Sequence, residues 1–443
     1  MSSTRFYLKT ALERNFTITL HDIERIISNF HFEMTKGLNG GESSLKMLPA
    51  FIDKASGNEQ GKFIALDLGG TNFRVLLVNL KGKGMTQVEC VNKYVIPRAV
   101  MHGTGTQLFN FIAKSINNFI QKNKIKFEDK SKLGFTFSFP IKQTNIASGL
   151  LITWTKDFSA TGVVGNNVVK MLRDALKSCG IGHINVVALA NDTVGTLAAK
   201  SYQDPNCDVG IIFGTGTNAC YVEEIANIRN LSKSARKAAH MVINMEWGNF
   251  NKLPLTPFDD MLDKASNNPG KQRMEKMISG MYLGELARLV LADLIKRQLI
   301  FTECQGKFSK GDFKTRHMSL IEADKTPMLG KINDYLESVG MFHSNLEDRK
   351  MLKKICKMVS VRAARISAAA ISAVVAWMDP ELKSNHTIGI DGTLYEKYPG
   401  FRRNILSTLQ EIHSGKAKKI KLSLAKDGSG IGVAIVAAVA ASR

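Results

Sequence analysis

The sequence lacks the paired cysteine spacings that mark disulfide scaffolds and zinc sites. Its 443 residues contain six cysteines, which lie far apart, without a C-x-x-C motif and without a cluster that joins them to the nine histidines. A disulfide framework needs paired cysteines, and a structural zinc site needs closely spaced ligands. We therefore expect neither, and the cysteine usage indicates a reduced, cytoplasmic protein.

Long apolar runs are also missing. The longest uncharged helical stretches, residues 366–378 and 428–442, fall short of the roughly 20 residues that span a bilayer. The first residues contain no apolar run of the kind found in signal peptides. Both stretches are rich in alanine, so we expect buried helices there rather than membrane anchors.

Acidic residues are scarce relative to basic ones. The chain has 60 lysines and arginines against 39 aspartates and glutamates, which gives a formal net charge of +21. A basic balance favours anionic partners such as nucleotides, nucleic acids or acidic membranes. The alternative is a solvated basic surface without a partner. No nucleic-acid-binding motif occurs, so only a weak association with anionic surfaces stays open.

The chain is long enough for two domains, and its hydrophobic patterns alternate between strands and helices, which favours an α/β fold. A turn-rich break at residues 57–62 is a candidate domain boundary. Helices are expected near 19–38, 107–121, 166–178, 282–298 and 352–377, and directly after 192. Strands are expected near 94–96, 132–140, 184–192 and 387–395, and as pairs within 64–78 and 209–225, while 420–440 is expected to form a strand, a glycine turn and a helix.

Two segments share an unusual plan, in which a glycine-rich turn separates two apolar strands. The turns are Gly69–Asn72 and Gly214–Asn218, and both end in G-T-N, which indicates an internal duplication. Successive N–H groups in such turns can bind phosphate, and glycine lets it approach closely. The sequence therefore predicts two phosphate-binding turns that face each other across a cleft, with plain hairpin turns as the alternative. The Walker pattern G-x-x-x-x-G-K-[ST] is absent, so neither turn is a P-loop.

Two carboxylates stand at the ends of predicted strands. Asp67 precedes the first turn and could serve Mg²⁺, directly or through water, because this ion prefers carboxylate, water and phosphate oxygens. Asp192 ends the strand at 184–192, and ligands of open α/β sheets bind at the carboxyl ends of strands. It could be a general base that takes a proton from an attacking alcohol. Alternatively, it only caps the helix that follows.

Taken in order, the motifs of the chain resemble the eukaryotic-type hexokinase family, which includes glucokinases. They include LDLGGTNFRVLLV, LGFTFSFP, WTKDF, NDTVGT, GTGTNACYVE, INMEWGNF, NPGKQRMEKMISGMYLGE, DGTLYEKYPGF and DGSGIGVAIVAAVA. The resemblance implies the two-domain sugar kinase fold of the actin/Hsp70/hexokinase superfamily, an α/β fold with ribonuclease H-like domains and a cleft between them. It implies a small domain at 61–192, on which a C-terminal helix at about 428–443 packs, and a large domain made of 1–60 and 193–427.

The activity implied by the resemblance is transfer of the γ-phosphoryl group of MgATP to the C6 hydroxyl of glucose or a related hexose, the entry step of glycolysis. Asp192 would be the general base, and Lys156 would offset charge on the transferred group. The implied sugar site comprises Ser138, Thr155, Lys156, Asn191, Asp192, Asn218, Glu246 and Glu275. The implied ATP site comprises Asp67, which would also serve Mg²⁺, with Gly69, Gly70, Thr71, Asn72, Arg74, Gly214, Thr215, Gly216, Thr315, Ser319, Gly392 and Thr393.

The chain departs from the resemblance at a few positions. Asp157 stands where the family usually has glycine, and Thr153 stands where glucokinases often carry an asparagine that reaches the sugar. Trp154 and Trp247 flank implied sugar contacts and are interpreted as core packing. The preferred hexose, regulation and oligomeric state stay open. A catalytically weak or inactive sugar sensor is the alternative function, against which the retained Asp192 argues.

Overall fold

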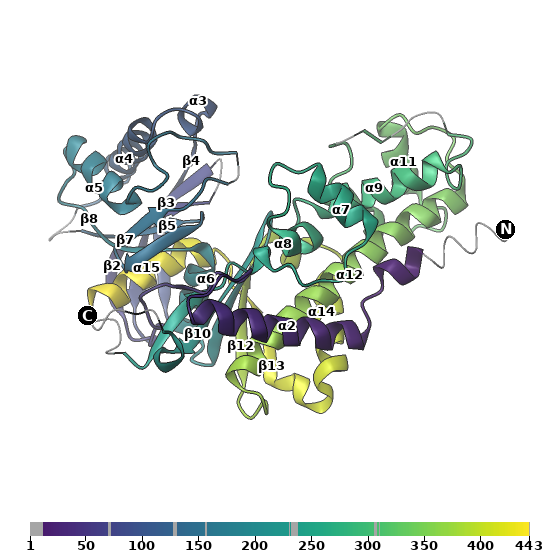
Figure 1. Cartoon of the computed structure of the whole chain (residues 1–443). Helices are drawn as coiled ribbons and strands as arrows, with labels where there is room; N and C mark the ends of the chain where they lie inside the picture. Colours follow the sequence, from purple (N-terminus) through teal and green to yellow (C-terminus); the bar gives the residue numbers. More distant parts are fainter. Residues whose placement is uncertain are drawn as a thin grey trace.

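The structure is a computed structural model that describes residues 12–69, 72–126, 131–155, 157–229, 231, 238–304, 308–309 and 311–442. In it the chain forms two lobes, each built around a β-sheet (Figure 1). The lobe at the left of Figure 1 contains the blue segments that follow the N-terminal helix, and the other lobe contains most of the teal and green segments. The mixed sheets and their flanking helices confirm the predicted α/β class.

The first sheet contains five strands, which run in the spatial order β4-β3-β2-β5-β8. Its members are β2 (Gln60–Leu68), β3 (Asn72–Lys81), β4 (Thr86–Val95), β5 (Lys132–Phe137) and β8 (Asn185–Ala190). The β2–β3 and β3–β4 pairs are antiparallel, whereas the β2–β5 and β5–β8 pairs are parallel. The last six residues of β2 are buried, as expected of a strand that is covered on both faces.

The second sheet contains six strands, which run in the order β1-β11-β10-β9-β12-β13. Its members are β1 (Leu48–Pro49), β9 (Cys207–Phe213), β10 (Thr217–Glu224), β11 (His240–Asn244), β12 (His386–Asp391) and β13 (Ile420–Leu424). Apart from the short β1, the strand directions repeat those of the first sheet, with two antiparallel pairs followed by two parallel pairs. The shared topology supports the internal duplication that the two glycine-rich turns indicated.

Two helices connect the sheets by crossing from one to the other. Helix α6 (Asp192–Gln203) follows β8 of the first sheet but packs on β9 of the second, and α15 (Gly428–Ala441) follows β13 of the second sheet but packs on β2 and β5 of the first. The two helices touch each other where glycines meet. A Cβ atom at Gly432 would lie 1.8 Å from the carbonyl oxygen of Gly195, so no larger side chain fits there.

The remaining helices pack around the two sheets and form much of the core of each lobe. Helices α4 (Gly105–Lys122) and α5 (Val168–Ser178) pack together in the core of the first lobe, and α2 (Leu20–Leu38) packs on α12 (Leu346–Met378) in the second. The other elements are α3 (Arg98–Met101), β6 (Ile141–Asn145), β7 (Ser148–Leu151), η1 (Ile225–Asn227), η3 (Trp247–Asn249), α7 (Pro257–Lys264), α8 (Arg273–Ile278), α9 (Leu283–Lys296), α10 (Thr315–Ala323), α11 (Gly330–Ser338), α13 (Thr393–Lys397), α14 (Phe401–His413) and η4 (Ser414–Lys419).

Helix α12 is longer than the sequence pattern predicted. It has 33 residues and is the one helix, among the described residues, that is long and apolar enough to cross a membrane. However, 83% of its most apolar window is buried inside the protein, as in the core helix of a globular fold. The expected helix at 428–442 is present as α15 and is also buried.

Most expected elements occur where the hydrophobic patterns placed them, with one clear error. The predicted strand at 387–395 ends at Asp391, and α13 begins at Thr393. Gly392 separates them with a φ of +122°, which breaks the extended backbone. Its absent Cβ would lie 2.2 Å from the carbonyl oxygen of Phe213, so the backbone turns here against the neighbouring strand.

Candidate active site

The junction between β8 and α6 presents the candidate base. Asn191 is the N-cap of α6, and its Oδ1 accepts a hydrogen bond from the N–H of Thr193 at 3.1 Å. Asp192 is the first residue of the helix, and its Oδ1 accepts from the same N–H at 2.9 Å. Capping is therefore the role of Asn191, and Asp192 has a half-buried carboxylate at a helix N-terminus, where the helix dipole favours negative charge.

A network of amides and one carboxylate lies next to this junction. The Nδ2 of Asn218, on β10, lies 3.3 Å from Oδ1 of Asn191, 2.8 Å from Oδ1 of Asn244 and 3.3 Å from Oε1 of Glu246. Asn244 donates from its own Nδ2 to Glu246 Oε1 at 2.9 Å. Three of the predicted sugar-site residues thus converge, from the end of β8, from β10 and from the segment after β11.

Asn244 belongs to this network but was missed by the sequence analysis. It is the last residue of β11, is 5% exposed, and its register partner on β10 is Cys220. The segment VINMEW gives no sign of its role, because only the β10–β11 pairing brings it to Asn218. A hairpin alignment of the two strands would have found it.

The backbone at Glu246 is unusual for a residue that is not glycine. Its φ is +54° and its ψ is 46°, in the left-handed region, which typically costs a non-glycine residue about 1 kcal/mol or more. The next residue, Trp247, is fully buried and donates from Nε1 to Oγ1 of Thr217 at 2.9 Å. Trp247 therefore packs in the core, as the sequence indicated, and holds the strained segment against β10.

The second glycine-rich turn is held by backbone and carboxylate contacts. Gly280 and Met281 donate from their backbone N–H groups to the carbonyl oxygens of Gly214 and Thr215, at 2.9 and 3.0 Å. Glu275 accepts from the N–H of Thr217 through Oε2 at 3.0 Å. A Cβ at Gly216 would lie 2.6 Å from that same oxygen, so the turn and the glutamate fit closely.

The first glycine-rich turn is flanked by an ion-pair cluster. Asp67 Oδ2 accepts from Arg74 Nη2 at 2.6 Å and from Ser429 Oγ at 3.0 Å, and Arg74 Nη1 donates to Asp427 Oδ1 at 2.5 Å. Burial opposes the charge on Arg74, but the carboxylate of Asp67 raises the pKa of the guanidinium. Asp427 and Ser429, which were not predicted from the sequence, reach the turn from the start of α15.

The other four residues of the predicted ATP site occupy two places. Gly392 lies directly against Phe213 and Gly214, so the end of β12 adjoins the second turn, and Thr393 begins α13 beside it. Thr315 begins α10, and its Oγ1 accepts from the N–H of Gly284 rather than from either turn, whereas Ser319 is half-buried on the same helix. Asp391 was not predicted; its Oδ2 accepts from Gly428 N at 3.1 Å, and burial raises the pKa of its carboxyl.

The remaining predicted sugar-site residues lie on the first lobe. Ser138 is 6% exposed and donates from its N–H to the Leu68 carbonyl at 3.1 Å, directly before the first turn. Thr155 is half-buried and accepts from the Phe158 N–H through its carbonyl oxygen. Trp154 stacks on Phe158 as core packing. Lys156, Gly70 and Thr71 lie outside the described residues.

Asp157 gives a physical reason for the glycine expected at its position. Its φ is +67°, in the left-handed region that favours glycine. The side chain is exposed and lies 3.8 Å from Arg98 and 3.9 Å from His102, too far for close ion pairs. This loop therefore carries backbone strain that a glycine would remove.

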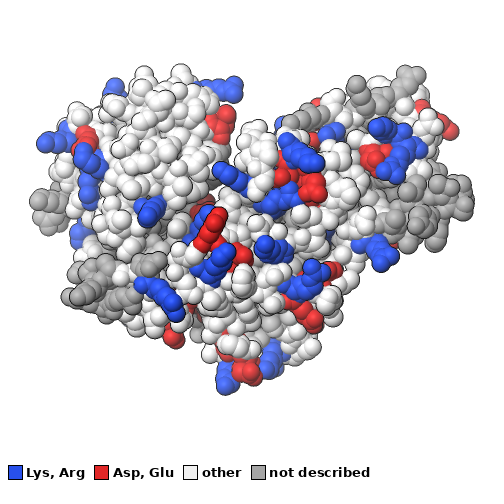
Figure 2. All heavy atoms as spheres, in the orientation of Figure 1, with Lys and Arg blue, Asp and Glu red and all other residues white. Residues whose placement is uncertain are grey.

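A space-filling view shows a notch between the two lobes (Figure 2). Basic side chains are dispersed over the visible face, with acidic ones among them, rather than gathered in one patch. Among the described residues, no group of three or more histidine, cysteine or acidic side chains is arranged to hold a metal ion. Asp67 can still supply one carboxylate ligand, and one carboxylate with phosphate oxygens and waters is a usual Mg²⁺ environment.

Solved structures place this fold among the sugar kinases. A hexokinase from Schistosoma mansoni, complexed with glucose, superposes with a TM-score of 0.88 at 35% identity, covering 99% of both chains. A second hexokinase crystal structure has a TM-score of 0.82 at 30% identity and covers 96% of this chain and 97% of the other. The two-domain sugar kinase fold predicted from the motifs is confirmed.

The sequence comparisons identify the family. Two family models, both described as hexokinase, match residues 9–202 and 208–439, and the chain belongs to the hexokinase family. Hexokinase-7 of Oryza sativa subsp. japonica is 44% identical over 92% of this chain and 91% of its own length. Hexokinase-1 of Homo sapiens is 41% identical over 96% of this chain but only 47% of its own length, so the chain spans about half of the mammalian relatives it matches.

Proposed function

We propose that this protein is an ATP-dependent hexokinase, which transfers the γ-phosphoryl group of MgATP to the C6 hydroxyl of glucose and of related hexoses. The observation that carries the proposal is the convergence of Asn191, Asn218 and Glu246 beside Asp192. The family membership and the glucose bound to the Schistosoma hexokinase support it. The product would be a hexose 6-phosphate, which enters glycolysis.

The sugar is read by groups that can both donate and accept. Hexose hydroxyls do both, and amide, hydroxyl and carboxylate side chains supply matching partners. Asn218 and Glu246 already satisfy one another in part, so a sugar would exchange some of these bonds for bonds to its own hydroxyls. Ser138, Thr155, Lys156, Asn191, Asp192 and Glu275 complete the proposed sugar site. A site that bonds each hydroxyl rejects analogues that lack one, because its polar groups are then left unpaired.

Asp192 is proposed as the general base. It takes the proton of the C6 hydroxyl as that oxygen attacks the γ-phosphorus in line, while the bond from phosphorus to the β-phosphate oxygen breaks. The hydrogen bond from Thr193 N–H orients the carboxylate, and the α6 N-terminus favours its ionised form. Lys156 is proposed to offset charge on the transferred group.

The two glycine-rich turns are proposed to hold the phosphates, with Gly69, Gly70, Thr71, Asn72 and Arg74 on one side and Gly214, Thr215 and Gly216 on the other. Thr315, Ser319, Gly392 and Thr393 are proposed to contact the rest of the nucleotide. Mg²⁺ neutralises phosphate charge when it is bound. Asp67 would serve this ion, directly or through water, with its Oδ2 already held by Arg74 and Ser429.

Sugar binding is proposed to draw the two lobes together. The proposed sugar groups come from both lobes, Ser138 from the first and Glu246 and Glu275 from the second. A hexose that contacts all three would bridge the two lobes and so favour a narrower notch. Closure then excludes water, which would otherwise compete with the C6 hydroxyl as the acceptor.

The domain division proposed for this motion is a small domain at 61–192 with the C-terminal helix packed on it, and a large domain at 1–60 and 193–427. A cytoplasmic location is also proposed, and the six free cysteines support a reducing compartment. Weak association with anionic surfaces is proposed from the +21 charge and should fall steeply with salt.

A coupled assay tests the proposal. Purified protein is supplied with MgATP and a panel of hexoses, with 6-deoxyglucose as a control that lacks the reacting hydroxyl. Turnover with glucose and none with 6-deoxyglucose is expected. A folded protein that binds glucose but turns over no hexose would contradict the proposal and would indicate a sugar-binding sensor.

A further inference from the structure

Helix α8 carries Glu275 but is too short to hold it in place unaided. It has six residues, Arg273–Ile278, and its N-cap residue Gln272 makes no side-chain capping bond. Isolated helices need roughly twelve residues or more to be even marginally stable, so contacts outside the helix must fix this one. The position of the Glu275 carboxylate against the second turn therefore depends on what surrounds α8.

Lys276, the residue after Glu275, is a buried cation. Its side chain is 3% exposed. Its ammonium donates to Asp263 Oδ1 at 2.6 Å and to the carbonyl oxygens of Asn268 and Lys271, both at 2.8 Å. An ammonium group has three donors, so every one of them has a partner here. These acceptors lie at the end of α7 and in the loop 266–271 that leads into α8.

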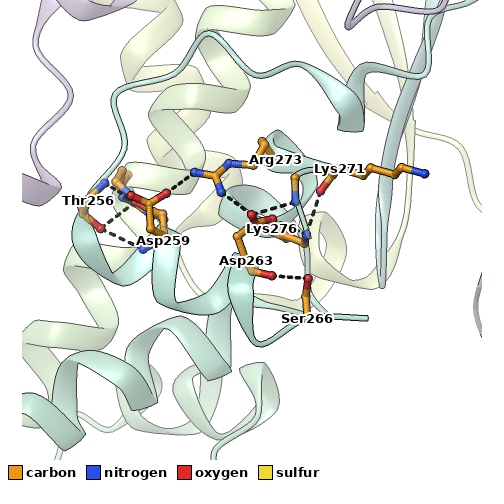
Figure 3. Close-up of polar contacts among 10 residues, drawn as sticks. Thr256, Asp259, Asp263, Ser266, Lys271, Arg273 and Lys276 are labelled. Atoms are coloured by element: carbon orange, nitrogen blue, oxygen red, sulfur yellow. Dashed lines mark hydrogen bonds and ion pairs between the residues drawn. The ribbon is translucent and has the colours of Figure 1, made fainter. Parts of the chain in front are cut away.

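Asp263 gathers the rest of the same loop. Its Oδ2 accepts from the N–H of Gly270 at 2.9 Å and from Arg273 Nη1 at 2.7 Å, and the Arg273 Nη2 reaches Asp260 Oδ1 at 2.5 Å. Figure 3 shows the side chains of Asp263, Arg273 and Lys276 pointing toward one another between α7 and α8. Burial opposes ionisation, but the bonds from Lys276 and Gly270 lower the pKa of Asp263.

Stability alone is a poor reason for such a pair. Removing two charges from water is costly, and replacing a buried ion pair by apolar side chains is often neutral or stabilising. What an ion pair with fixed acceptors adds is directional geometry. Here two residues of α8, Lys276 and Arg273, both bind the carboxylate of Asp263 on α7. The position of α8 is thereby fixed relative to α7.

We propose that Lys276, acting through Asp263 and the 266–271 loop, is a positioning residue that holds Glu275 against the second turn and so determines sugar affinity. The inference rests on the proposed function, because Glu275 is assigned to the sugar only there. Lys276 is not among the residues proposed to contact the sugar or ATP, and its ammonium is fully used by Asp263 and the loop carbonyls. Lys276 fixes the position and orientation of α8, and therefore the position of the Glu275 carboxylate.

The test compares Lys276→Met with Lys264→Met in the full chain. Lys264 is also basic, lies next to Asp263 on α7, and is exposed, so the same substitution there controls for loss of charge. We expect Lys276→Met to raise the glucose KM by at least about tenfold, since a displaced Glu275 would lose its hydrogen bond to the sugar and bonds to a charged group are worth roughly tenfold or more. The kcat and the KM for ATP should change by less than about threefold, a split that simple loss of folded protein would not produce.

Asp263→Asn is the second variant, because it keeps an acceptor for Lys276 and is milder. If Lys276→Met does not fold, the glucose KM of Asp263→Asn, compared with that of Lys264→Met, tests the positioning role instead. Glucose affinity is also measured by titration calorimetry without ATP. A KM and affinity within about twofold of those of Lys264→Met would overturn the positioning role. Absence of hexose turnover in the unmodified protein would instead contradict the proposed function, and the calorimetric affinities would still test the positioning role.

Discussion

The two sheets share a topology but carry different chemistry at matching positions. The second residue pair from the turn differs between the two hairpins. In the first hairpin this pair is Asp67 and Arg74, and in the second it is Ile212 and Asn218. Arg74 joins an ion-pair cluster that includes Asp427, whereas Asn218 donates its amide into a network of uncharged and carboxylate oxygens. The duplicated frame thus fixes where a side chain stands, and its residue type decides whether the site suits a charged or a hydroxylated group.

The helices that follow the sheets differ in the same way. Helix α6 begins with Asn191 as N-cap and Asp192 as first residue, and α15 begins with Asp427 as N-cap and Gly428 as first residue. Asp427 holds Arg74, so its carboxylate is used within the protein. Under the proposed function, only the first of these helix starts supplies a base, and the second supplies an anchor.

The largest expected effect separates these two carboxylates. Asp192→Asn should lower kcat by at least about 100-fold, because a positioned base contributes at least that much, while glucose binding is retained. Asp427→Asn should change kcat by less than about threefold, because its carboxylate only neutralises Arg74. Steady-state kinetics of both variants measure this. Similar losses in the two would mean that the helix starts are not functionally distinct.

The next effect concerns stability and separates the two hairpins. Arg74→Met leaves the buried Asp67 without its cation and should lower the free energy of unfolding by about 2 kcal/mol, the range of bonds between charged groups. Asn218→Ala removes two hydrogen bonds to amide oxygens and a longer one to the Glu246 carboxylate, and should cost about 1 kcal/mol. Urea denaturation in low and high salt measures both.

The salt dependence of the two stability losses is the control for the comparison of Arg74→Met with Asn218→Ala. The Arg74–Asp427 part of the cluster is exposed on the aspartate side and is screened by ions, so the effect of Arg74→Met should shrink in high salt. The loss of unfolding free energy caused by Asn218→Ala should be the same in low and high salt. Equal salt dependence of the two would contradict the assignment of an ion-pair cluster to one hairpin and of an amide-centred hydrogen-bond network to the other.

Contiguous motifs made much of this architecture predictable. The apolar runs on each side of the glycine-rich turns predicted β2, β3, β9 and β10, and the strand end at 184–192 predicted where Asp192 would stand. These features are local, because strand and turn propensities act over a few residues. The error at 387–395 was also local, since Leu394 and Tyr395 continue an apolar pattern that fits a strand or a helix equally well.

Contacts between distant segments could not be predicted in the same way. Arg74 meets Asp427 across 353 residues, and neither neighbourhood signals the other. The exchange of α6 and α15 between the sheets is equally invisible, because each helix is simply apolar and glycine-containing. The Lys276–Asp263 pair is closer in sequence, but a Lys and an Asp thirteen residues apart carry no pattern until the 266–271 loop folds back.

A pH effect distinguishes the first residues of two equivalent interior strands, β12 and β5. His386 begins β12 and is buried between Asp208, at 2.6 Å from Nδ1, and Asp379, at 3.3 Å from Nε2, whereas Lys132 at the matching start of β5 is exposed. The hydrogen bond to Asp208 raises the pKa of His386 despite burial. The protonated form therefore stabilises the fold below the unfolded pKa of about 6.5, and this contribution is lost as pH rises through the higher folded pKa.

Urea denaturation between mildly acidic and alkaline pH measures this contribution. The free energy of unfolding of the unmodified protein should fall relative to that of His386→Gln as pH rises. Asp208→Asn should remove most of the difference, because it removes the main cause of the raised pKa. A constant gap between the unmodified protein and His386→Gln at all pH values would show that the histidine is not charged in the fold.

The smallest effect on stability compares two left-handed residues, one in each lobe. Asp157 and Glu246 have φ of +67° and +54°, and glycine would relieve the strain at both. Asp157→Gly should raise the free energy of unfolding by up to about 1 kcal/mol and leave the glucose KM unchanged, because the exposed side chain makes only distant ion pairs. Glu246→Gly relieves the same strain but deletes the acceptor for Asn218 and Asn244, so its glucose KM should rise strongly. If both variants only gained stability, the strain at Glu246 would serve no site, and the proposed sugar contact would be wrong.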